Sequence, residues 1–292
     1  MTRRTALSSV STAGAAAVLS LTAGLSDRLS RAEAAAAGMK GRINHSVCKW
    51  CYGKIPLEDL CKAAKGIGLS SIELLGPEDW AMLRKYDLTC AMPHGAGDGI
   101  TKGWNRLENH DRLIESYSSV IPKVADAGLD KIICFSGNRA GLDDEKGIEN
   151  CSIGLKRLMP LAEKHKVTVV MELLNSKVDH KDYQCDRTPW GVALCKQVGS
   201  ERFKLLYDIY HMQIMEGDMI ATIKKYHPYI AHYHTGGVPG RAEIDESQEI
   251  YYPAVMKAIV DTGFKGFVAQ EFIPKRPDVL GSLKQGVQIC DV

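Results

Sequence analysis

The chain has 292 residues, of which 45% are hydrophobic, 25% charged and 7% aromatic. This is the composition of an ordinary folded protein, and it excludes a collagen-like, a disordered or a multi-span membrane protein. The formal net charge is +2, and residues 1–37 account for it with four arginines against two acids. The neutral remainder argues against a nucleic-acid-binding protein, which needs a basic face to displace phosphate counterions.

Residues 1–37 have the pattern of an export signal. The pair Arg3-Arg4 precedes an uncharged stretch over 5–26, and four alanines follow at 34–37. A basic start, an uncharged middle and a small-residue end are typical of secretory signals, and the paired arginines resemble a twin-arginine signal. The uncharged stretch contains eight Ser and Thr residues, which makes a stable membrane span unfavourable. We therefore expect export to the periplasm, or a cytoplasmic protein if the signal is not functional, with 38–292 as the catalytic domain.

The nine cysteines all follow this segment, and an odd number cannot form a complete set of disulfides within one chain. Cys48 and Cys51 have the spacing of a redox or zinc pair, but no second pair completes a zinc site. We interpret them as small apolar fillers near the end of a first strand.

Short apolar runs alternate with amphipathic stretches from residue 42 onward. The eight runs, typical of parallel strands buried on both faces, are 43–47, 71–75, 88–92, 131–135, 167–171, 203–207, 229–233 and 266–269. The helix-like stretches are 56–65, 112–127, 145–165, 189–198, 218–226, 253–262 and 277–289. Repeated strand–helix units of this number predict an α/β protein with a single (β/α)8 TIM barrel. An open doubly wound sheet is the alternative, but its Gly-x-Gly-x-x-Gly turn is absent after the first strand.

The last four apolar runs each end in a carboxylate or a histidine, namely Glu172, Asp208, His234 and Glu271. Active sites of such barrels lie at the carboxyl ends of the strands, so we expect these side chains to share one rim. Three carboxylates and an imidazole cannot crowd together without compensation, because like charges repel and desolvation is costly. The sequence therefore predicts a divalent metal site with oxygen and nitrogen ligands, suited to Mn²⁺ or Mg²⁺ and also to Co²⁺.

Four segments resemble the hydroxypyruvate isomerase family of the xylose-isomerase-like TIM-barrel superfamily: 171–175 (MELLN), 207–217 (YDIYHMQIMEG), 239–243 (PGRAE) and 270–272 (QEF). The resemblance covers residues 42–290. It implies that Glu172, Asp208, His234 and Glu271 bind the metal and that the two glutamates are the catalytic acid/base pair. It also implies an isomerase that converts hydroxypyruvate to tartronate semialdehyde through an enediolate.

Three further residues are candidates for binding the substrate. His211 lies three residues after Asp208 and could hydrogen-bond the oxygen on which charge develops. Arg241 could pair with a substrate carboxylate, and His94 follows the third apolar run. Asn175 and Glu249 are candidates for supporting these groups.

Two departures leave the substrate open. His234 stands where many hydroxypyruvate isomerases have Gln, whereas ketose 3-epimerases of the superfamily have His there. Those epimerases also have a second Glu six residues after the first, where this chain has Val178 followed by Asp179. The alternatives are therefore a ketose 3-epimerase, a non-catalytic sugar-binding barrel, or a nuclease similar to endonuclease IV. The partner we expect is a small hydroxy-keto acid or sugar, with no nucleic acid and no stable membrane span; a homo-oligomer is left open.

Overall fold

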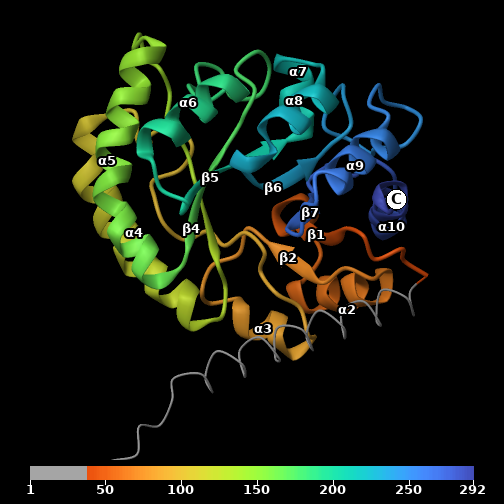
Figure 1. Cartoon of the computed structure of the whole chain (residues 1–292). Coiled ribbons are helices and arrows are strands. Elements are labelled where there is room, and N and C mark those ends of the chain that lie inside the picture. The colour runs from red at the N-terminus through yellow and green to blue at the C-terminus, as the bar shows by residue number, and fades with distance from the viewer. Residues whose placement is uncertain (1–37) are drawn as a thin grey trace, which may run out of the picture.

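The computed structural model describes residues 38–292, so the expected export signal lies outside the described residues (Figure 1). Seven strands form one parallel sheet in the order β2-β1-β7-β6-β5-β4-β3. They are β1 (Asn44–Cys48), β2 (Ser71–Glu73), β3 (Lys131–Cys134), β4 (Thr168–Glu172), β5 (Phe203–Asp208), β6 (Ile230–Thr235) and β7 (Phe267–Gln270). The sheet thus runs in chain order from β3 to β7 and continues through β1 to β2, which is the strand order of a TIM-barrel-like fold.

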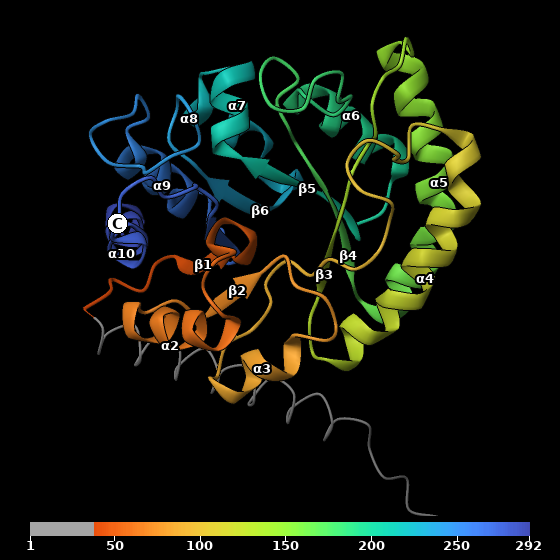
Figure 2. The same cartoon turned by 180° about the vertical axis from the view of Figure 1, so that it is seen from behind.

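Helices surround the strands in both views (Figures 1 and 2). They are α2 (Leu57–Ile67), α3 (Trp80–Lys85), α4 (His110–Asp126), α5 (Asp144–His165), α6 (Thr188–Val198), α7 (Ile209–Met215), α8 (Met219–Tyr226), α9 (Tyr252–Asp261) and α10 (Val279–Cys290). Three 3-10 helices are η1 (Lys49–Tyr52), η2 (Leu107–Asn109) and η3 (His227–Tyr229). The longer helices match the amphipathic stretches expected from the sequence to within a few residues.

The expectation of a regular strand at 88–92 was wrong. This segment makes a single parallel bridge, between Thr89 and Ser71. It nevertheless lies between β2 and β3, because Leu74 N donates to Met92 O at 2.9 Å and Ile133 N donates to Pro93 O at 3.1 Å. The ladder breaks because Ala91 N donates to the Ser71 hydroxyl and Pro93 has no N–H to donate.

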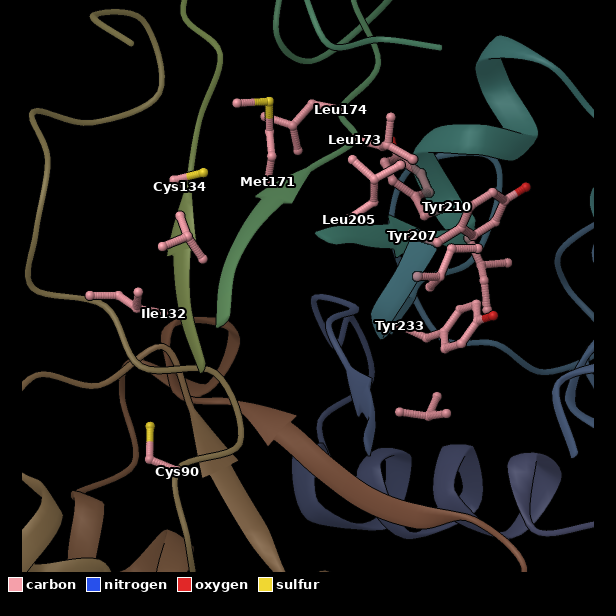
Figure 3. Packing of buried hydrophobic residues seen from close by; sticks show 14 of the residues in the cluster. Cys90, Ile132, Cys134, Met171, Leu173, Leu174, Leu205, Tyr207, Tyr210 and Tyr233 are labelled. Atoms are coloured by element: carbon pink, nitrogen blue, oxygen red, sulfur yellow. The ribbon is translucent and has the colours of Figure 1, made fainter. Parts of the chain in front are cut away.

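Side chains of the strands alternate between an outer and an inner packing layer. Outward residues pack under the helices, and Figure 3 shows Ile132, Cys134, Met171, Leu205 and Tyr233 among them. The inner layer contains a smaller apolar cluster of Met92, Ile133, Val170 and Leu206. Two positions further along β4 and β5, the same inward face reaches Glu172 and Asp208. The pleat of the strands therefore aims both carboxylates at the mouth of the barrel.

The cysteines in the described part of the chain are all free, with Cys48 buried at the end of β1 and Cys51 half-buried in η1. None of the helices in residues 38–292 is long and apolar enough to cross a membrane.

Candidate metal centre and adjoining pocket

The four rim residues expected to converge do converge. Glu172 ends β4, Asp208 ends β5, His234 lies in β6, and Glu271 follows β7 directly. One ligand atom from each lies within 4.8 Å of the others, and all four residues are buried. We call these four residues the carboxylate–histidine cluster.

The closest contacts within the cluster centre on one oxygen of Glu271. His234 Nδ1 lies 2.8 Å from Glu271 Oε2 and 3.3 Å from Glu172 Oε1. Arg241 Nη2 lies 2.5 Å from the same Glu271 oxygen and 3.4 Å from Asp208 Oδ2. Five ionisable groups therefore share a space that water does not reach freely.

This crowding changes the protonation of the carboxyl groups in different directions. Burial, together with the charge of Glu271, raises the pKa of Glu172. Burial raises the pKa of Asp208 well above its usual value. Burial would also raise the pKa of Glu271, but the nearby charges of Arg241 and His234 lower it well below its usual value. The two glutamates thus have pKa values displaced in opposite directions, an arrangement found in acid/base pairs.

Glu73, at the end of β2, is a site residue that the sequence analysis missed. Its Oε1 lies 2.8 Å from His232 Nε2 and 2.8 Å from His234 Nε2. Burial opposes its ionisation, but the two imidazoles lower its pKa to about 2, so it is a buried carboxylate. The sequence feature that could have revealed Glu73 is a glutamate inside the apolar run 71–75. Strand β2 ends at this residue because the next one, Leu74, has a φ of 58°.

The contact with Glu73 determines which nitrogen of His234 faces the cluster. Burial opposes ionisation of His234, but the groups around it, Cys48 and Glu271 among them, raise its pKa well above its usual value, so Nε2–H donates to Glu73 and Nδ1–H to Glu271. Because Glu73 keeps the Nε2 proton, loss of the Nδ1 proton would leave a lone pair directed at the cluster. Nδ1 is the nitrogen that lies beside Glu172 and Glu271. One lone pair and three carboxylates directed at a common space form a donor set that fits a divalent cation.

His211 is held as a neutral hydrogen-bond donor. Asn175 Oδ1 accepts from the backbone N–H groups of Val178 and Asp179, so its Nδ2 is the atom 2.7 Å from His211 Nδ1. His211 Nδ1 is then an acceptor, and the ring proton is on Nε2, 3.5 Å from Asp208 Oδ2. Burial and the charge of Arg241 hold the pKa of His211 well below its usual value.

Arg241 is fixed by the loop that follows β6. Its guanidinium lies over the ring of Trp50 at 5.1 Å and the ring of Tyr210 at 5.3 Å. Gly237 lets this loop fold back, because a Cβ there would lie 2.2 Å from the backbone oxygen of Glu243. Arg241 is the residue expected to pair with a substrate carboxylate, and in the structure its Nη2 contacts Glu271 and Asp208.

A pocket of about 580 Å³ opens beside the cluster, and Glu172, Glu271 and Arg241 line it. His94 is exposed and also lines this pocket. His180, which the sequence analysis did not select, lines it too and lies edge-on against His211, with 5.2 Å between ring centroids.

Of the two residues expected to support the substrate-binding groups, Asn175 does so in the structure and Glu249 does not. Asn175 orients His211, as described above. Glu249 was misplaced by sequence reasoning: it is exposed, it accepts from Gln213 Nε2 at 2.9 Å, and it lines a different pocket. The sequence places Glu249 in the loop after β6, but it does not show whether that loop turns the Glu249 side chain toward the site or away from it.

Comparisons with known proteins agree with this architecture. The family model described as "Xylose isomerase-like TIM barrel" matches residues 61–288. The human "Putative hydroxypyruvate isomerase" is 31% identical over 112 residues, which is 38% of this chain and 40% of that protein. The "2-oxo-tetronate isomerase" of Cupriavidus necator is 36% identical over 109 residues, 37% of this chain and 41% of that protein. The matched region is thus about two fifths of the length of each relative.

Two solved structures share the fold at low sequence identity. The AP endonuclease, family 2, from Brucella melitensis has a TM-score of 0.75 at 21% identity, covering 84% of this chain and 98% of that one. The D-psicose 3-epimerase with D-tagatose from Clostridium cellulolyticum H10 has a TM-score of 0.66 at 17% identity, covering 83% and 89%. Taken with the family model, which spans more than half of the sequence, these observations place the chain in the xylose isomerase-like TIM barrel family.

Proposed function

We propose that this protein is an isomerase that moves a proton between adjacent carbons of a small hydroxy-keto acid or sugar. The observation that carries the proposal is the convergence of Glu172, Asp208, His234 and Glu271 within 4.8 Å, beside a pocket that both glutamates line. The relatives named hydroxypyruvate isomerase and 2-oxo-tetronate isomerase support the reaction class. Among substrates, we favour hydroxypyruvate, which would give tartronate semialdehyde.

The carboxylate–histidine cluster would hold one divalent cation, for which Mn²⁺ or Mg²⁺ suits three carboxylate oxygens and one imidazole nitrogen. When bound, such a cation acidifies the C–H bond next to a carbonyl and stabilises the negative charge of an enediolate.

The two glutamates would perform the proton transfer. One carboxylate takes the proton from the carbon that bears the hydroxyl group, the C–H electron pair forms the C=C bond of the enediolate, and the carbonyl oxygen takes up the charge. A carboxyl group then returns a proton to the former carbonyl carbon, and the hydroxyl proton of the neighbouring carbon passes to the former carbonyl oxygen as that neighbour becomes the new carbonyl. Glu172 ends β4 and Glu271 directly follows β7, so they would approach a bound substrate from different strands.

His211 and Arg241 would bind and orient the substrate. The Nε2–H of His211 is a neutral donor 3.5 Å from Asp208 Oδ2, suited to an oxygen on which charge develops. Arg241 would turn one edge of its guanidinium toward a substrate carboxylate, at the mouth of the pocket where His94 also lies.

A ketose 3-epimerase is the second candidate. His234 favours it, because ketose 3-epimerases of the superfamily have a histidine at this position. Both reactions need the same two glutamates, so the cluster alone does not separate them. A trinuclear nuclease site is disfavoured, because residues 235–250 contain no further histidine and the chain outside 1–37 is neutral.

Solvent-exchange measurements test the proposal. The protein would be loaded with Mn²⁺ and incubated in D2O with hydroxypyruvate, and separately with D-fructose, and the products followed by proton NMR. We expect deuterium to enter the carbon that receives the proton. If both substrates stay free of deuterium while Mn²⁺ binds, the isomerase proposal is wrong.

We further propose that residues 1–37 direct export through the twin-arginine pathway. Fused to a reporter, this segment should deliver it to the periplasm, and the double substitution R3K/R4K should retain it in the cytoplasm. Export that survives the double substitution would exclude this route.

A further inference from the structure

The pocket beside the carboxylate–histidine cluster is much larger than the substrate favoured above. It is an open pocket with a volume of about 580 Å³. If each non-hydrogen atom is given ~30 Å³, the volume of one water molecule in the liquid, hydroxypyruvate fills only about 200 Å³. A three-carbon acid at the cluster would therefore leave most of the pocket to water.

Most of the lining of the pocket is apolar. We call this part of the lining the apolar wall, and it consists of Leu74, Ile100, Ile133, Phe135 and Leu174. None of these side chains can donate or accept a hydrogen bond. Water held against such a surface is easily displaced by an apolar group, and burying that group is favourable in proportion to its area.

The wall is built by segments that the reaction does not need. Leu74 follows β2, Ile133 and Phe135 lie in and after β3, and Ile100 belongs to a loop with left-handed glycines at positions 95, 97 and 99. The charged groups of the same pocket, Glu172, Arg241 and Glu271, come from β4 and from the segments after β6 and β7. One cavity therefore combines charged groups with an apolar wall.

From this continuity we infer that the site also accepts α-hydroxy ketones with an apolar substituent, whose reacting carbons lie at the carboxylate–histidine cluster and whose substituent covers the apolar wall. The inference rests on the proposed isomerase function and extends its substrate class beyond small hydroxy-keto acids and sugars. The substituent extends away from the glutamates toward Ile100 and Phe135.

A matched pair of ketones tests the inference. Hydroxyacetone and 1-hydroxy-4-phenylbutan-2-one have the same reacting carbons and differ by a benzyl group. We expect the phenyl compound to bind the Mn²⁺-loaded protein at least about tenfold more tightly by calorimetry, with a correspondingly lower KM for deuterium exchange. Equal affinities for the two compounds would overturn the inference.

A matched pair of variants locates the effect. Ile100→Ser should reduce the affinity ratio of the two ketones to about threefold or less, because it places a hydroxyl against the benzyl group. Ile153→Ser changes an exposed isoleucine on α5 outside the pocket and should leave the ratio as it is. An unchanged ratio in Ile100→Ser would mean that the apolar wall does not bind the substituent.

The outcomes separate this inference from the proposed function. Exchange of both ketones at equal affinity would retain the isomerase and refute the substrate class. Tight binding of the phenyl compound without exchange of either ketone would support the apolar subsite and refute the isomerase.

Discussion

The two sides of the barrel differ in regularity and in chemistry. Strands β4 to β7 are paired in parallel along most of their length, with one register shift at Leu205/Leu206, and they place Asp208 opposite His234 and His234 opposite Ala269. Between β2 and β3, by contrast, the segment 88–92 makes a single bridge. The regular side carries the carboxylate–histidine cluster, and the irregular side contributes most of the apolar wall.

This difference shows how one barrel separates reaction from recognition. Charged groups that must meet within a few ångströms benefit from adjacent strands in register, because the pleat then fixes where each side chain points. A binding surface tolerates irregular backbone, because its shape comes from loops. Substitutions on the two sides should therefore affect different measured quantities.

The largest effect should come from the regular side. Glu271→Gln keeps the size of the side chain but removes the carboxylate that would move the proton, so we expect deuterium exchange to fall by about 10²–10⁴-fold. The rate would be measured by NMR, with circular dichroism to check the fold. Glu249→Gln, an exposed glutamate outside the pocket, is the matched control and should keep the native rate. Native exchange in Glu271→Gln would show that another group is the base.

A second effect should come from Glu73, which would act on the cluster through His234. In Glu73→Gln an amide faces the two imidazoles in place of a carboxylate, which weakens its hold on the Nε2 proton of His234. We expect Mn²⁺ affinity to fall about 10–100-fold, measured by calorimetric titration.

The matched control for this variant is Glu78→Gln, an exposed glutamate five residues further on. Thermal unfolding of both variants would distinguish a lost fold from a weakened metal site. Unchanged Mn²⁺ affinity in a folded Glu73→Gln protein would remove Glu73 from the metal centre.

A smaller, substrate-dependent effect should come from Arg241. If it binds a substrate carboxylate, Arg241→Gln should raise KM for hydroxypyruvate about 10–100-fold and change KM for dihydroxyacetone much less. Steady-state kinetics on the two substrates would measure this. An equal loss for both would instead assign Arg241 to the cluster, in keeping with its contacts to Glu271 and Asp208.

The smallest effect concerns the loop that holds Arg241. Glu243 accepts from the backbone N–H groups of Lys275 and Arg276, both at 3.0 Å, and from the Ser282 hydroxyl at 2.9 Å. Burial opposes its ionisation, but these donors lower its pKa to about 2. Because the pKa is lower in the folded than in the unfolded chain, where it is about 4.3, this stabilisation is present above pH ~4.3 and is lost as the pH falls toward 2.

Glu243→Gln should therefore cost about 1–3 kcal/mol of unfolding free energy at pH 7, and the deficit should shrink at pH 3. Thermal unfolding at both pH values would measure it, with Glu246→Gln, an exposed neighbour, as the control. A deficit that grows on acidification would contradict the assigned role.

Much of the molecule was predictable from local patterns. Seven of the eight apolar runs form strands near the expected positions, because a residue buried on both faces of a parallel sheet must be apolar wherever it occurs. The run at 88–92 failed as a regular strand because a side-chain hydroxyl of Ser71 and the missing N–H of Pro93 interrupt the ladder, and pairing of this kind is invisible without the neighbouring strand.

The sequence by itself determined the alternation of strands and helices and the four polar strand ends, since both depend on spacing along the chain. Only the tertiary structure decided that Glu73 turns His234 toward the cluster, that Asn175 sets the proton of His211, and that the pocket is walled by apolar residues. These relations join residues that are up to 161 positions apart, and hydrogen-bond geometry and cavity shape exist only once distant strands lie side by side.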